Sequence, residues 1–157
     1  MLHVNFKLIF NMIKTASLLV TIILSCLSVC AQQQWNQFRG PEGNGIAQDD
    51  FKYPVEFNQG KNIMWSAEID TGVSSPVIWE DYIFLTSHRS DTFCTVAYDR
   101  LSGDLKWQRE VKADTIQRFH PISSAAAPSV TTNGKHVISY FGSYGLLCYS
   151  LEGDLVW

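Results

Sequence analysis

From residue 61 onward, the apolar positions of the chain fall into short runs that are separated by turn residues. Four such runs lie at residues 74–79, 82–87, 93–99 and 104–107. The turns between them carry Glu-Asp, Arg-Ser-Asp and Ser-Gly. Short apolar runs bounded by such residues are typical of strands, and no run shows the 3.6-residue period of an amphipathic helix. This stretch therefore predicts four antiparallel strands.

The same order of runs recurs in the C-terminal part of the chain. The second set lies at residues 126–130, 136–141, 146–150 and 154–157. Asn133-Gly134, between the first two runs, is a strong signal for a tight hairpin turn. Trp107 and Trp157, which end the two sets, are 50 residues apart, and Trp65 precedes Trp107 by 42 residues. The two sets are therefore copies of one repeat.

Four short strands repeated at a period of about 40–50 residues are the signature of propeller blades. One four-stranded blade cannot cover its own faces and buries them against neighbouring blades of a closed ring. The sequence therefore predicts an all-β propeller with about two tryptophan-ended blades, plus a lone outer strand at 61–69. We expect this incomplete ring to be a fragment, a truncated gene product or a subunit in an assembly of several copies.

The N-terminal part of the chain has the layout of a secretory signal. Lys7 and Lys14 precede the uncharged apolar run 16–29, and small residues follow at 29–31. This order of charge, apolar run and small residues predicts a signal peptide over 1–31, with Gln32 first in the mature chain. We therefore expect an exported protein, periplasmic or secreted.

Three alternatives for this segment stay open. Translation starting at Met12 would also give a signal of normal length. The apolar run could remain as an anchor, although it is short for a membrane span. Lipidation of Cys26 or Cys30 would make the protein a lipoprotein and associate it with the outer membrane.

Residues 32–60 predict an irregular leader that precedes the repeats at 61–157. The leader holds a dense set of turn residues between Gly40 and Gly45, and Trp35 and Phe38 are expected to anchor it on the repeats.

Charge and cysteine content exclude some classes of protein. Loss of residues 1–31 removes two of the 12 basic residues and none of the 15 acidic ones, which leaves a net charge of −5. A nucleic-acid partner is therefore not expected, because phosphate binding requires a basic surface. Only Cys94 and Cys148 lie in the mature chain. Export permits a disulfide between them, but two small buried apolar side chains is the simpler interpretation.

Residues 97–107 read A-Y-D-R-L-S-G-D-L-K-W and resemble the repeat of the pyrroloquinoline-quinone-like β-propeller family, A-x-D-x-x-T-G-x-x-x-W. The motif positions are held by Ala97, Asp99, Ser102, Gly103 and Trp107, with serine in place of the usual threonine. Residues 148–157 form a weaker copy that is one residue shorter. It keeps the glycine and the tryptophan at Gly153 and Trp157, and Trp65 occupies the tryptophan position of a preceding repeat.

The leader adds to this resemblance, because residues 35–45 are similar to the W-x-x-F-R-G-P-x-G-x-G opening of a secreted bacterial subgroup of the same family. Within the repeat, the aspartate and the Ser-Gly pair are expected to close the turn before the outer strand through side-chain hydrogen bonds to the backbone. The tryptophan is expected to pack on the next blade. These roles are structural, so the motif indicates the architecture of the protein and does not indicate a catalytic or binding activity.

Candidate chemistry is sparse. In related quinone enzymes the cofactor stacks on a disulfide between adjacent cysteines, and no adjacent pair occurs here, so no cofactor is expected for this chain alone. His88, His120 and His136 are 32 and 16 residues apart, which matches no compact metal motif. Arg118 and His120 lie in the long loop between the two repeats, where propellers place binding residues, and could together meet an anionic ligand.

The sequence therefore favours an exported propeller-repeat module that binds or scaffolds, with no catalysis by this chain alone. Its expected partners are a protein or the remaining blades. The alternative is the N-terminal part of a periplasmic quinone-dependent oxidoreductase whose active site lies in further blades.

Overall fold

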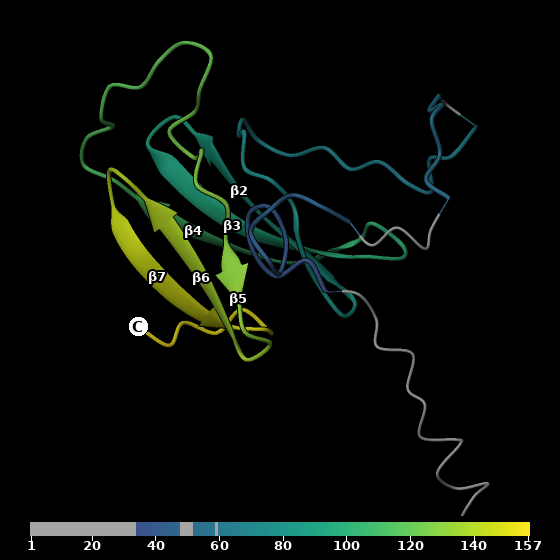
Figure 1. The fold of residues 1–157 in the computed structure, drawn as a ribbon. Coiled ribbons are helices and arrows are strands. Elements are labelled where there is room, and N and C mark those ends of the chain that lie inside the picture. Colours follow the sequence, from purple (N-terminus) through teal and green to yellow (C-terminus); the bar gives the residue numbers. More distant parts are fainter. Residues whose placement is uncertain (1–33, 48–51, 59) are drawn as a thin grey trace, which may run out of the picture. The chain divides into compact units, whose positions relative to one another are not determined.

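The computed structural model describes residues 34–47, 52–58 and 60–157, and these residues form two antiparallel sheets without a helix (Figure 1). The first sheet has the order β1 (Val77–Trp79), β2 (Tyr82–Arg89), β3 (Thr92–Asp99) and β4 (Leu105–Lys112). The second has the order β5 (Thr131–Thr132), β6 (His136–Phe141) and β7 (Gly145–Ser150). The predicted all-β class is confirmed, and the described sheets do not close into a ring. The expected signal peptide at 1–31 lies outside the described residues.

The turns of the first sheet follow the sequence prediction. Trp79 pairs with Tyr82 and Arg89 pairs with Thr92, so two-residue turns join β1 to β2 and β2 to β3. Glu80 and Ser90 begin these turns with φ angles of 50° and 55°. Turns with positive φ fit the right-handed twist of the flanking strands, so the strands stay paired along their length.

The predicted lone strand at 61–69 is wrong, because residues 62–70 form no strand. Backbone groups of a strand need a paired neighbour. Around this segment the described residues supply only single bridges, Asn58 to Lys61 and Thr71 to His88. The segment instead lies across the first sheet, where the hydroxyl of Tyr98 donates to the carbonyl of Glu68.

The second sheet has three named strands where four were predicted. Residues 126–130 form none, because the Thr86 hydroxyl of the neighbouring sheet donates to the carbonyl oxygens of Ala126 and Pro128. Proline also has no N–H for a ladder. At the other edge, Tyr149 makes a single bridge to Leu155, so the expected outer strand at 154–157 is reduced to isolated pairing.

The two sheets pack face to face, and β3 supplies the centre of the interface. Phe93 stacks on Phe141 with 4.7 Å between ring centroids, and both are fully buried. The hydroxyls of Thr95 and Ser139, also fully buried, form a hydrogen bond of 2.7 Å across the interface. Alternation along the strand directs Cys94, the neighbour of Thr95, to the opposite face of the first sheet.

Both cysteines of the described region are free thiols and are buried. Burial raises the pKa of the Cys94 thiol and that of the Cys148 thiol. The interpretation of two small buried apolar side chains is confirmed.

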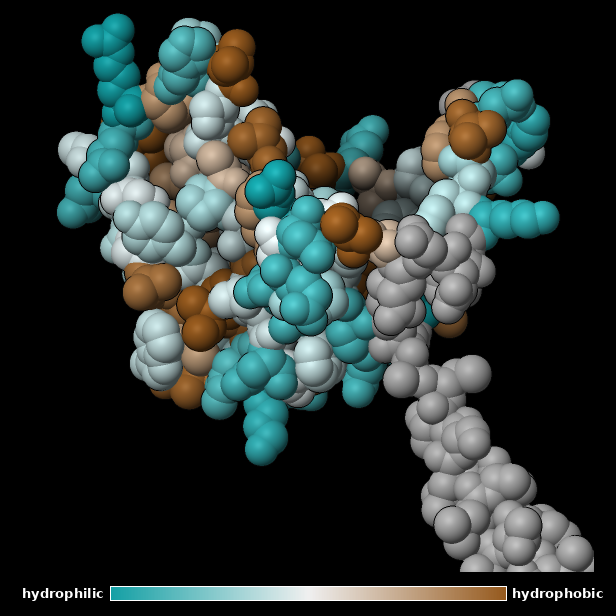
Figure 2. Space-filling view, viewed as in Figure 1, coloured by the Kyte–Doolittle hydropathy of each residue, from teal (hydrophilic) through white to brown (hydrophobic). Residues whose placement is uncertain are grey.

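The outward face of the second sheet carries apolar side chains that the described residues leave exposed. Tyr140 pairs with Leu146 and points away from the first sheet, because its neighbour Phe141 points toward it. Trp157 exchanges backbone hydrogen bonds with Cys148, which is also on this side. Tyr140, Leu146 and Trp157 are 47%, 58% and 58% exposed, and we call these three residues the open face. Figure 2 shows hydrophobic surface in the part of the view where Figure 1 draws β6, β7 and the C-terminal residues.

Candidate functional site

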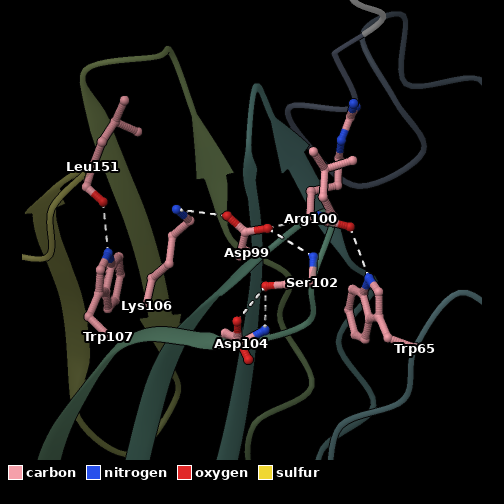
Figure 3. A network of polar contacts seen from close by, with 9 residues as sticks. Trp65, Asp99, Arg100, Ser102, Asp104, Lys106, Trp107 and Leu151 are labelled. Carbon is pink, nitrogen blue, oxygen red and sulfur yellow. Dashed lines mark hydrogen bonds and ion pairs between the residues drawn. The ribbon is translucent and has the colours of Figure 1, made fainter.

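The turn between β3 and β4 is held by the side chains that the repeat motif predicts (Figure 3). Asp99 accepts hydrogen bonds from the backbone N–H groups of Leu101 and Ser102, at 2.9 and 3.0 Å. The hydroxyl of Ser102 accepts from the N–H of Asp104 at 3.2 Å and contacts its carboxylate at 2.7 Å. Gly103 closes the turn with a φ of 79°, a conformation that glycine adopts without strain. The predicted turn-closing roles are confirmed.

Asp99 is also the acidic partner of Lys106, at 3.0 Å. The N–H of Ser102, the ammonium of Lys106 and the N–H of Leu101 together lower the pKa of Asp99 from 3.8 to about 2. The same contact raises the pKa of Lys106. The turn therefore prefers an ionised aspartate.

Trp65 and Trp107 each lie on a glycine turn that comes later in the chain. The indole N–H of Trp65 donates to the carbonyl of Arg100 at 2.9 Å, and its ring covers Gly103 so closely that a Cβ there would be 2.5 Å from the ring. In the same way, Trp107 donates to Leu151 at 2.7 Å and covers Gly153, where a Cβ would be 2.7 Å from the ring.

A tyrosine completes each of these contacts. Tyr98 lies 6.5 Å from the ring of Trp65, and Tyr149 lies 5.9 Å from that of Trp107. The second turn is one residue shorter, because the N–H of Ser150 donates to the carbonyl of Asp154 whereas that of Asp99 donates to the carbonyl of Asp104, and it keeps the tryptophan contact. We call these two contacts, of Trp65 with the Gly103 turn and of Trp107 with the Gly153 turn, the interlock.

The loop between the two sheets forms an open pocket of about 190 Å³ against the second sheet. Gln117, Arg118 and Phe119 line it from the loop, and Tyr140 and Ser143 line it from β6 and the following turn. The loop is fixed there because the N–H of Gln117 donates to the Ser143 hydroxyl at 2.8 Å. Arg118 therefore lies at the pocket.

The structure does not bring His120 to the same pocket. His120 lies in the following turn, where its Nδ1 accepts from the N–H of Ile122 at 3.3 Å. Arg118 lines the pocket, and His120, two residues later, does not. Their expected joint contact with an anionic ligand stays a prediction.

The described residues contain no group of three or more His, Cys, Asp or Glu side chains arranged to hold a metal ion. His88 packs between the rings of Phe93 and Phe119, at 6.1 and 5.9 Å. His136 lies on β6 and accepts from the Thr132 hydroxyl through its backbone carbonyl. Within the same residues, no helix has the length and apolar character needed to cross a membrane.

Two further tryptophan–glycine contacts were not predicted from the sequence. Trp79 lies against Gly134 in the hairpin of the second sheet, and Trp35 lies against Gly40 in the leader. Both glycines have positive φ angles, 82° and 78°. Trp35 and Trp79 lie outside the repeat motif, so the motif does not predict these contacts. The sequence signal that could have indicated them is a tryptophan together with a glycine in a predicted turn.

Comparison with the models of known protein families and with curated proteins found no match.

Acidification should remove part of the stability that Asp99 provides. A carboxylate with a lowered pKa stabilises the fold above its unfolded value of 3.8, and this contribution is lost as the pH falls toward about 2. Asp99→Asn keeps a turn-closing acceptor and loses the charge. We expect its urea midpoint to lie below that of the wild type at pH 7, with the two converging between pH 4 and pH 2.

Glu152→Gln is the control for this comparison, because Glu152 lies on the turn that follows β7 and forms no ion pair among the described residues. Its urea midpoint should follow that of the wild type at each pH. A gap between Asp99→Asn and wild type that is constant from pH 7 to pH 2 would contradict the assignment.

Proposed function

We propose that this chain is part of an exported β-propeller of pyrroloquinoline-quinone-like repeats, and that it works as a non-catalytic binding scaffold. The observation that carries this proposal is the interlock, in which a tryptophan of one repeat covers the glycine turn of the next. It occurs at Trp65 on Gly103 and again at Trp107 on Gly153. A contact that repeats in one direction along the chain is what a ring of blades requires.

The register of Trp157 supports a further contact of the interlock type at the open face. Trp107 pairs with Ala97, and Trp157 exchanges hydrogen bonds with Cys148, the residue that replaces Ala97 in the second copy. Trp107 is 7% exposed and Trp157 is 58% exposed. The open face is thus the same kind of surface that the first sheet buries. We expect it to take a further sheet with a glycine turn.

A scaffold role fits the contacts that the motif residues make. Asp99 and Ser102 bond the backbone of their own turn, and Trp65 and Trp107 bond the backbone of the next. All four side chains are thereby engaged in holding the architecture. Partner contacts are assigned to the loop pocket and to the open face, and the site of action is the periplasm or the cell exterior, as the N-terminal segment predicts.

The resemblance to quinone enzymes favours a second candidate, the N-terminal part of a quinone-dependent oxidoreductase. Calorimetric titration of the purified chain with pyrroloquinoline quinone and Ca²⁺ tests the proposal that this chain performs no catalysis. We expect no saturable heat, because the described residues present no cluster of acidic ligands for the ion. Saturable binding together with alcohol-dependent reduction of an electron-accepting dye would overturn the scaffold proposal in favour of the enzyme.

A further inference from the structure

The leader crosses the free edges of both sheets. β1 and β5 are the terminal strands of their sheets, and an edge strand presents unpaired backbone groups that can accept another strand. Figure 1 draws the first part of the leader, in blue, beside β5. Residues 34–36 lie against both edges, and we call them the clasp.

The clasp pairs with β1 as a short added strand. The N–H of Trp35 donates to the carbonyl of Ile78 at 2.9 Å, and the N–H of Ile78 donates to the carbonyl of Trp35 at 2.8 Å. Gln34 extends this contact, because its side-chain oxygen accepts from the N–H of Glu80 at 2.7 Å. The outward backbone groups of Ile78 are therefore satisfied by the leader.

The next residue of the clasp bonds the other sheet. The carbonyl of Asn36 accepts from the N–H of Thr132 at 2.9 Å and from the hydroxyl of Thr131 at 3.3 Å. Its side-chain amide donates to the carbonyl of Thr132 at 3.5 Å. Two consecutive residues of the leader therefore form backbone hydrogen bonds with the edge strands of two different sheets.

Closure of the clasp leaves a polar atom unsatisfied. The side-chain oxygen of Asn36 is buried and has no hydrogen-bond partner among the described residues. A buried acceptor without a partner opposes the closed state, since water would satisfy it in an open one. The clasp pairs with each edge over a single residue, whereas β2 and β3 pair over eight. These features suit a segment that can leave the edges while the sheets stay folded.

We propose that the clasp is a displaceable internal strand that covers a binding edge for an extended peptide. Strand addition to an exposed edge uses main-chain hydrogen bonds for affinity, and Ile78 and Thr132 supply the N–H and carbonyl groups that such a peptide needs. The partner is an extended segment of another protein that pairs with β1 and β5 in place of residues 34–36. This inference does not depend on the ring of the proposed function, because both edges exist in the two described sheets.

Trp35→Pro in the full chain tests the proposal, because proline removes the N–H that donates to Ile78. We expect the amides of Ile78 and Thr132 to exchange hydrogen about tenfold faster than in the wild type, with amides of β2 and β3 unchanged. The variant should also bind a labelled synthetic peptide of residues 34–46 more tightly than the wild type, measured by fluorescence anisotropy. Gln37→Pro is the control, since Gln37 makes no hydrogen bond to either sheet in the described region.

Unchanged exchange at Ile78 and Thr132 would overturn the proposal. So would faster exchange without a gain in peptide binding, because the edge would then be open but unable to take a strand. If Trp35→Pro does not fold, Trp35→Gly provides the same test with the N–H retained and the indole on Gly40 removed. It should show the same two changes to a smaller extent, and the absence of both would contradict the clasp.

Discussion

Replacement of Gly153 by alanine should lower the free energy of unfolding by about 2–4 kcal/mol, the sum of backbone strain and overpacking. Gly153 has a φ of 88°, which an L-residue adopts at a cost. Its added Cβ would also come within 2.7 Å of the ring of Trp107, which is buried and hydrogen-bonded to Leu151. The ring cannot retreat without giving up that bond. Urea unfolding followed by circular dichroism measures the loss.

Gly43→Ala is the matched control. Gly43 has a φ of 65°, but nothing lies within 4 Å of the position of its Cβ. It should therefore show only the strain, about 1 kcal/mol. If both substitutions cost the same, the ring of Trp107 does not restrain the Gly153 turn, and the interlock contributes no stability at this position.

The second large effect concerns association. The purified chain should self-associate, because the open face exposes tyrosine, leucine and tryptophan side chains on one sheet, and contiguous apolar surface of this kind drives association. Leu146→Glu places a charge on that face and should shift the chain toward monomer in sedimentation velocity.

Leu101→Glu serves as the comparison, since Leu101 is 61% exposed, much as Leu146 is at 58%, but lies on the turn before β4. It should leave the association state unchanged. A monodisperse wild-type monomer that melts cooperatively would contradict the role assigned to the open face. Equal effects of the two substitutions would show that general charge, and not this face, controls association.

Local sequence signals predicted the parts of the fold that local contacts determine. The turns at Glu80, Ser90 and Gly103 follow from turn residues between apolar runs. The roles of Asp99 and Trp107 follow from the repeat motif. In each case the decisive hydrogen bonds join residues that are close in sequence or are placed by the repeat period.

The parts that were not predicted depend on contacts between distant segments. The strand expected at 126–130 is absent. The hydroxyl of Thr86, about 40 residues earlier, donates hydrogen bonds to two carbonyl groups of that segment, which are therefore not available for strand pairing. Asn36 forms a hydrogen bond with Thr132, 96 residues later in the chain, and no sequence pattern in the leader predicts this contact. The pocket at Arg118 depends on the hydrogen bond from the N–H of Gln117 to the hydroxyl of Ser143, 26 residues later, and His120 does not line it.

The direction of the interlock limits how copies of this chain can assemble. A second copy that approached head to tail would bring its Trp157 to the Gly103 turn, which Trp65 of the first copy already covers. Growth of an open filament by this heterologous contact is therefore blocked unless Trp65 is displaced. Two copies can still associate through their open faces. That contact is isologous, so it uses the same surface on both copies and leaves no open face for a third copy. Self-association should accordingly stop at dimers.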